Sequence, residues 1–227
     1  MRYHAQVDGD DDLDDDALGA RYFVPLAAAF VRGRLGDPTL ADLAAMRAGR
    51  AAGLRLHKFK RNGELPRVKR VLGALRGLAP ASLLDVGSGR GTFLWPLLDA
   101  FPDLPVTAID HDARRASDLF CVHAGGVERL SAERQDATKT TFADGAFDVV
   151  TMLEVLEHFP DPAAGAREAV RVATRNVVVT VPSKEDDNPE HLHLFDAATL
   201  DALFTRAGAR RVVCEHVLNH IVAFVHK

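Results

Sequence analysis

The sequence predicts an α/β fold in which a doubly wound, mostly parallel sheet follows an N-terminal helical extension. Three observations lead to this prediction. An apolar segment runs directly into a turn with three glycines at residues 87–91. Short apolar segments then alternate with helical patterns towards the C-terminus, which is typical of βα units. Residues 176–182 are apolar almost throughout, as expected for a strand that is covered on both faces.

The boundaries of the predicted elements follow from hydrophobic periodicity and from start and stop residues. Seven strands are expected, and four helices lie between them, the last capped by Asp196. Because ligands bind at the carboxyl ends of parallel strands, the functional site is expected at that edge. The strands are predicted at 82–86, 105–110, 129–135, 147–153, 176–182, 212–217 and 221–225, and the helices at 92–100, 112–124, 162–173 and 196–207.

The region before the sheet, residues 17–80, is predicted to be helical and basic. Helices are expected at 17–35, at about 40–52 and at 66–78. Residues 47–76 hold ten lysines and arginines against one acid, Glu64. This basic segment is either the solvated surface of helices or a footprint for an anionic substrate such as RNA. Residues 1–16 hold seven aspartates and are expected to form a disordered acidic tail.

Composition is that of an ordinary globular protein, with 47% hydrophobic and 26% charged residues. The 227 residues suffice for one α/β domain, expected at 81–227, plus the extension. No apolar run reaches membrane-spanning length and no apolar leader begins the chain, so a cytoplasmic protein without a membrane partner is expected. The two cysteines lie far apart and form no CxxC pair, which excludes a zinc site of that type.

The glycine turn indicates the type of cofactor. From Asp85 to Thr92 the sequence is D-V-G-S-G-R-G-T, whereas dinucleotide-binding folds use G-x-G-x-x-G. The segment resembles the first motif of the class I S-adenosylmethionine (SAM)-dependent methyltransferases, and the resemblance extends from about Ser82 to the C-terminus. It implies that the turn backs the methionine part of SAM, or of its product S-adenosylhomocysteine (SAH). It also implies that Asp85 orients the loop and the cofactor amino group. An NAD-dependent oxidoreductase is the alternative from another class.

Two further acids end the next strands of the predicted sheet. The resemblance implies that Asp110 accepts hydrogen bonds from the ribose hydroxyls of SAM and that Asp136 accepts one from the adenine amino group. Each acid alone also suits a cap or a turn, which is the commoner use of aspartate. The complete predicted cofactor set is Asp85, Gly87, Ser88, Gly89, Gly91, Asp110, His111, Asp136, Ala137 and Leu153.

A second motif, E-x-x-E-H, lies at the carboxyl end of the fourth strand. If Glu154 begins a helical turn, Glu157 and His158 share its face. Two carboxylates and an imidazole suit a divalent cation, here Mg²⁺ or Mn²⁺. Of the two histidines that follow the fifth strand, we choose His193 over His191 to complete the metal shell or to act as general base. The predicted metal ligands are Glu154, Glu157, His158 and His193, and the predicted catalytic residues are Glu157, His158 and His193.

Two methyltransferase families resemble this arrangement. One comprises the metal-dependent O-methyltransferases of ubiquinone biosynthesis, and the other the small-RNA 3′-terminal 2′-O-methyltransferases. The RNA family places its later histidine in H-x-F-E-W, whereas this chain has His193-Leu194-Phe195-Asp196 and lacks the tryptophan at the next position. We therefore predict SAM-dependent O-methylation assisted by a divalent metal, possible acceptors being the terminal ribose of RNA and a small hydroxylated metabolite. The alternatives are methyl transfer without metal and a non-catalytic SAM-binding partner subunit.

Overall fold

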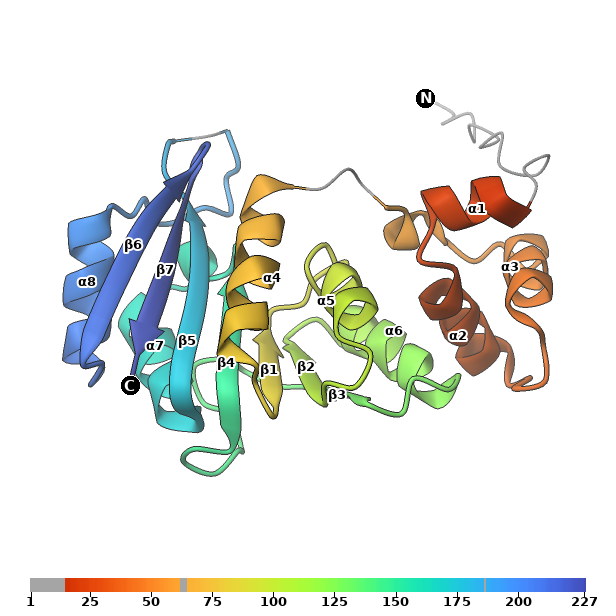
Figure 1. Cartoon of the computed structure of the whole chain (residues 1–227), viewed down its shortest axis with the longest axis horizontal. Coiled ribbons are helices and arrows are strands. Elements are labelled where there is room, and N and C mark those ends of the chain that lie inside the picture. The colour runs from red at the N-terminus through yellow and green to blue at the C-terminus, as the bar shows by residue number, and fades with distance from the viewer. Residues whose placement is uncertain (1–14, 62–64, 186) are drawn as a thin grey trace.

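The sheet sets the frame of the molecule. In the computed structural model, which describes residues 15–61, 65–185 and 187–227, seven strands pair in the order β3-β2-β1-β4-β5-β7-β6 (Figure 1). Strands β1 to β5 are parallel, and β7 lies antiparallel between β5 and β6. The predicted doubly wound, mostly parallel sheet is therefore confirmed. The strands are β1 (Leu83–Val86), β2 (Val106–Asp110), β3 (Leu130–Arg134), β4 (Phe147–Leu153), β5 (Ala173–Pro182), β6 (Arg211–Val217) and β7 (His220–His226).

Helices cover both faces of the sheet. Strand side chains alternate between two apolar clusters, with Leu83 in one and Leu84 in the other, because successive residues of a strand point to opposite faces. No helix among the described residues is both long and apolar enough to cross a membrane. The first cluster includes α4 (Pro66–Leu78), α5 (Leu94–Ala100) and α6 (Ala113–Ala124), and the second includes α7 (Pro162–Val172) and α8 (Ala197–Arg206).

The N-terminal extension differs from its prediction at one point. Instead of a single helix over 17–35, two helices meet at Tyr22 and Phe23. The Phe23 amide donates to the Phe59 carbonyl at 2.9 Å, and Tyr22 forms an isolated antiparallel bridge with Lys60. These contacts take the two residues out of a continuous helix. The elements are α1 (Asp15–Arg21), α2 (Val24–Leu35), α3 (Asp42–Ala51) and the 3₁₀ turn η1 (His57–Phe59), while residues 1–14 of the predicted acidic tail lie outside the described residues.

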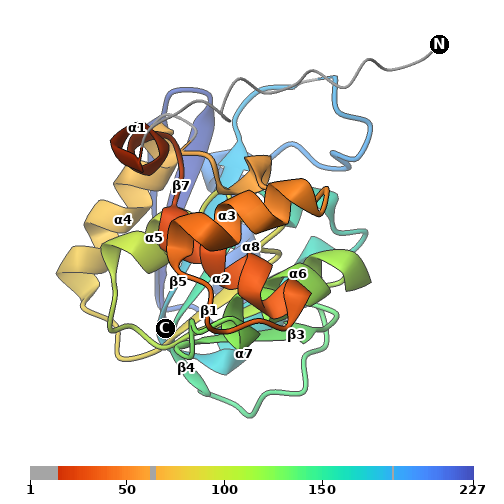
Figure 2. The same ribbon diagram turned by 90° about the vertical axis from the view of Figure 1, so that its right-hand side faces the viewer.

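The extension shares a core with the sheet. Helix α2 packs against both α3 and α6 (Figure 2). Where α2 meets α6, the two backbones are so close that a Cβ on Gly125 would lie 1.7 Å from the Ala29 carbonyl oxygen. A Cβ on Gly33 would lie 2.0 Å from the Cys121 carbonyl oxygen. The contact therefore requires glycine within α2 and at the residue that directly follows α6.

Replacing Gly125 by alanine is expected to lower the free energy of unfolding by about 3 kcal/mol, because the added methyl group must displace backbone. The φ of Gly125 is −86°, which alanine adopts freely, so the loss reports packing alone. Gly73→Ala is the matched control: no atom lies within 4 Å of its added Cβ, and a helical Gly→Ala change stabilises by about 0.5–1 kcal/mol. Urea denaturation measures both. A Gly125→Ala variant as stable as the wild type would contradict the α2–α6 contact.

Candidate functional site

The glycine turn follows the carboxyl end of β1, and the strand order of the sheet reverses next to it, between β1 and β4. Gly87, Gly89 and Gly91 have φ of 68°, 58° and 81°, a region that favours glycine. A Cβ on Gly87 would also lie 2.6 Å from Val155, and one on Gly91 would lie 2.0 Å from Trp95. Backbone conformation and close packing therefore both require glycine here, and ligands of doubly wound sheets bind at this reversal point.

Asp85 is the buried acid beneath this turn, with 2% of its surface exposed. Its carboxylate accepts hydrogen bonds from the hydroxyls of Ser88 at 2.6 Å and Thr151 at 2.8 Å. Burial raises the pKa of Asp85 to about 6, and the nearby carboxylate of Asp110 adds to this rise, while the two hydroxyl bonds oppose it. A cationic ligand group beside Asp85 would stabilise its charged form.

A pocket of about 180 Å³ opens above Asp85. It is smaller than the roughly 300 Å³ of the smallest typical ligand sites. The predicted residue Gly91 lies on a neighbouring cavity instead. Five predicted cofactor residues line the pocket, namely Asp85, Gly87, Ser88, Gly89 and Leu153, and Arg67, Val68, Arg90, Thr92, Phe93 and Glu154 join them.

The other predicted cofactor residues lie at the ends of β2 and β3 but do not line this pocket. The carboxylate of Asp110 is only 1% exposed, because it accepts hydrogen bonds from the amides of Gly89 and Asp112, both at 2.9 Å. Asp136 is exposed, and hydrogen bonds from the Thr138 hydroxyl and amide lower its pKa. Of their neighbours, His111 is exposed and Ala137 is half-buried. The backbone of the glycine turn thus covers the acid that was predicted to bind ribose.

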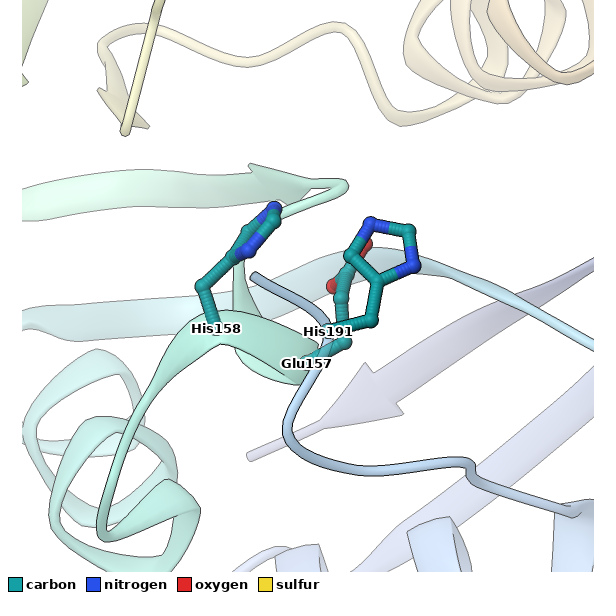
Figure 3. Close-up of side chains that lie close together, drawn as sticks. All are labelled: Glu157, His158 and His191. Carbon is teal, nitrogen blue, oxygen red and sulfur yellow. The ribbon is translucent and has the colours of Figure 1, made fainter. Parts of the chain in front are cut away.

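The acceptor-side cluster consists of Glu157, His158 and His191. The first two belong to the 3₁₀ turn η2 (Leu156–His158), and the third comes from the loop after β5 (Figure 3). One ligand atom from each lies within 4.8 Å of the others, and Glu157 is fully buried. The loop is held against η2 because the Leu192 amide donates to the Glu157 carbonyl at 2.8 Å. The sequence-distant residues therefore form one donor group beyond the end of β4.

The histidine tautomers follow from their partners. His158 Nδ1 lies 2.8 Å from the Glu190 carbonyl oxygen, and His193 Nε2 lies 2.9 Å from the Phe159 carbonyl oxygen. A carbonyl only accepts hydrogen bonds, so these two ring nitrogens carry the hydrogen. His158 Nε2 and His193 Nδ1 consequently keep the lone pairs that can bind a metal or take a proton.

Two members of the predicted metal set lie outside this cluster. The condition that Glu154 begins a helical turn is not met, because its φ is 56° and η2 begins only at Leu156. Its carboxylate instead accepts from the Thr180 hydroxyl at 2.7 Å and lies 3.0 Å from His220 Nε2. Burial lowers the pKa of His220. His193, engaged with the backbone of Phe159, is likewise not part of the cluster, and His191 takes the place proposed for it.

Comparison with known families decides the assignment. Residues 56–215, more than half of the chain, match the methyltransferase domain family. The chain belongs to this family. Over 93 residues it is 36% identical to the ubiquinone biosynthesis O-methyltransferase of Ralstonia nicotianae, a match that covers 40% of this chain and 37% of that protein. Over 103 residues it is 35% identical to the chloroplastic tocopherol O-methyltransferase of Arabidopsis thaliana, covering 43% of this chain and 29% of that protein.

Solved structures agree with the methyltransferase fold. A SAM-dependent methyltransferase from Aquifex aeolicus superimposes with a TM-score of 0.57 at 19% identity, covering 73% of this chain and 99% of the other. The [4+2]-cyclase SpnF superimposes with a TM-score of 0.55 at 18% identity, covering 69% of this chain and 79% of that one. The curated relatives match only over about a third of their length. The fold is therefore established, while the reaction is argued from the site.

Sequence reasoning missed three residues of the candidate site. Thr151 supports Asp85, and Arg67 lines the pocket above Asp85, 3.6 Å from Glu154. His220 reaches the same glutamate from β7. Thr151 does carry a recognisable signal in the sequence, because it is an inward-facing threonine in an apolar strand. Arg67 comes from α4, which precedes β1, and His220 comes from β7 near the end of the chain; no local pattern marks either residue.

Proposed function

We propose that the protein is a SAM-dependent O-methyltransferase with a divalent metal bound by Glu157, His158 and His191. The observation that carries the proposal is this cluster, placed just beyond the strand end that borders the cofactor pocket. Family membership supports methyl transfer, and the names of the two relatives favour an oxygen acceptor.

The residues around the glycine turn fit the amino-acid end of SAM. Asp85 would pair with its ammonium group, and Gly87, Ser88 and Gly89 would let it lie against the backbone. When bound, SAM supplies a methyl group on a strongly electrophilic sulfonium. Asp110 and Asp136 would hold the ribose and the adenine. The Gly89 and Asp112 amides each donate to one oxygen of the Asp110 carboxylate, which leaves acceptor positions on both, but at 1% exposure this carboxylate would have to become more accessible to hold ribose.

The donor chemistry of the cluster fits a transition metal better than Mg²⁺. One carboxylate and two imidazoles are present, and imidazole is a ligand of transition ions, whereas Mg²⁺ prefers oxygen. Of the two ions considered, Mn²⁺ is therefore the better match. A metal there would lower the pKa of an acceptor hydroxyl. His193 Nδ1 lies outside the cluster and is our candidate to take the proton.

Charge pairing favours a small hydroxylated acceptor over RNA. In the basic segment 47–76, Lys58 pairs with Asp118 and Arg61 pairs with Asp99. Arg67 and Arg70 likewise lie within 4 Å of glutamates. Cations that are neutralised inside the protein release few counterions on binding RNA, so they add little affinity for phosphates. We therefore place the terminal ribose of RNA second.

Metal removal tests the proposal. Treatment with EDTA is expected to abolish SAH release from SAM in a screen of hydroxylated acceptors, and Mn²⁺ is expected to restore it about tenfold better than Mg²⁺ at equal concentration. SAH production is measured by mass spectrometry. Undiminished turnover in EDTA would remove the metal from the mechanism, and transfer only to amines would remove the O-methyltransferase assignment.

A further inference from the structure

A second cavity, with a volume of about 470 Å³, lies outside the proposed cofactor pocket. We call it the α4–α5 cavity. Its walls are the segment 57–61 of the extension, helix α4, and the beginning and end of α5. Its volume falls within the range of about 300–1,000 Å³ that small-molecule sites occupy. Size alone therefore suits a small organic ligand.

The lining of this cavity has two distinct parts. Apolar side chains, among them Leu72, Trp95 and Ala100, provide one surface. Six lysine and arginine side chains lie around it, and the cavity has one carboxylate, that of Asp99. An apolar surface surrounded by an excess of positive charge is complementary to a ligand that combines an apolar body with an anionic group.

Internal pairing neutralises only part of this charge. Lys58 binds Asp118, and Arg61 makes two hydrogen bonds to Asp99 at 3.0 and 3.3 Å. Arg76, by contrast, is exposed and has no polar side-chain partner within the described part of the chain. The guanidinium of Arg76 is thus available to an anion.

The α4–α5 cavity adjoins the cofactor pocket. Val68, Arg90 and Thr92 line both. A molecule in the cavity would therefore be in contact with residues that also border the proposed SAM site. This continuity would let an acceptor in the cavity reach the proposed SAM site, because the two substrates must meet. Since no residue of the metal cluster lines the cavity, the acceptor hydroxyl would have to extend past the shared residues towards that cluster.

The aromatic residues of the cavity argue against single-stranded RNA as the occupant. RNA-binding grooves offer exposed aromatic faces on which bases stack. Trp95 is only 2% exposed, and its ring packs against Phe59 at a centroid distance of 4.8 Å. Phe23 is 6% exposed, and the Arg61 guanidinium lies 4.2 Å above its ring. Neither ring is free to stack on a base.

We propose that the α4–α5 cavity binds the methyl acceptor and that this acceptor is a small amphipathic anion, a phosphate or carboxylate joined to an apolar body. The proposal rests on the proposed function, since it names the substrate class of the same enzyme. Arg76 would pair with the anionic group, and Leu72 and Ala100 would contact the apolar part.

Tryptophan fluorescence tests the proposal directly, because Trp95 is the single tryptophan of the chain and lines the cavity. The probes are octyl phosphate, 1-octanol and inorganic phosphate at constant ionic strength. Octyl phosphate is expected to bind at least about tenfold more tightly than either of the others. Arg76→Glu and the cavity-filling variant Ala100→Phe should each weaken octyl phosphate binding about tenfold or more. Arg206→Glu, an exposed arginine on α8, is the matched control and should leave it unchanged.

Three results would overturn the proposal. They are equal affinity for octyl phosphate and 1-octanol, equal loss in Arg76→Glu and Arg206→Glu, and tight binding of a 20-nucleotide RNA at 0.15 M salt that Ala100→Phe does not weaken. Titration of SAH into the same samples separates the two claims. Proteins that bind SAH but not octyl phosphate would refute the cavity proposal alone, while failure to bind SAH would refute the proposed function.

Discussion

Glu157→Gln is expected to weaken Mn²⁺ binding about 100-fold, with the affinity for SAH unchanged. The side chain is fully buried and belongs to the three-residue donor cluster, so its carboxylate is the only negative charge that the cluster itself offers a metal. Glutamine keeps the shape but removes that charge. Electron paramagnetic resonance of free Mn²⁺ measures the affinity without any need for an acceptor, and SAH titration shows that the fold persists.

Matched variants separate the predicted ligand set from the cluster in the structure. His191→Ala should lose Mn²⁺ affinity as Glu157→Gln does. Glu154→Gln and His193→Ala should retain it, because Glu154 bonds to Thr180 and His193 bonds to the backbone of Phe159. Equal losses of Mn²⁺ affinity in all four variants would mean that Glu154 and His193 also bind the metal. No loss in Glu157→Gln would remove this cluster as a metal site.

Asp85→Asn is expected to stabilise the folded protein at neutral pH and to weaken SAH binding. The folded-state pKa of Asp85, about 6, lies above the ordinary value of 3.8, so the ionised form is penalised in the fold. Ionised Asp85 therefore lowers the folding stability by at most about 3 kcal/mol, a cost that is complete at pH values above 6. The cost disappears as the pH falls towards 4. Asparagine avoids it and can still bond to Ser88 and Thr151. The ammonium of SAH would lose a charge-assisted bond of about 1.5–3 kcal/mol, so its affinity should fall at least about tenfold.

The role of Asp85 also predicts how SAH affinity and folding stability depend on pH. Wild-type affinity for SAH should decrease as the pH falls below about 6, because Asp85 becomes protonated, whereas Asp85→Asn should show no such step. Urea denaturation at pH 4 and pH 8 should show the stability advantage of Asp85→Asn only at pH 8. A wild-type SAH affinity that is constant between pH 5 and pH 8 would contradict a pairing of Asp85 with the cofactor ammonium.

The fold and the glycine turn were predictable because their signals are local. Strand periodicity and capping residues place elements within a few residues of their observed positions, as for β4 at Phe147–Leu153 and α4 at Pro66–Leu78. The glycines at 87, 89 and 91 are set by their own backbone conformation. The break between α1 and α2 was not predictable, because it depends on Phe59 and Lys60, which are distant in sequence.

The acceptor side was predictable in residue type but not in arrangement. The E-x-x-E-H motif led to Glu157 and His158, but helical spacing misplaced Glu154, whose positive φ accompanies contacts with β5 and β7. The choice between His191 and His193 depends on how the loop docks onto η2 through the Leu192 amide. Contacts between residues that are distant in the sequence produce no hydrophobic periodicity that could predict them.

Isothermal titration of the wild-type protein with SAH tests the central claim most directly. We expect one SAH to bind per chain, with an affinity that EDTA does not change at neutral pH, and we expect no binding of NAD. Binding of NAD in place of SAH, or binding of neither, would contradict the assignment of the glycine turn to a SAM site.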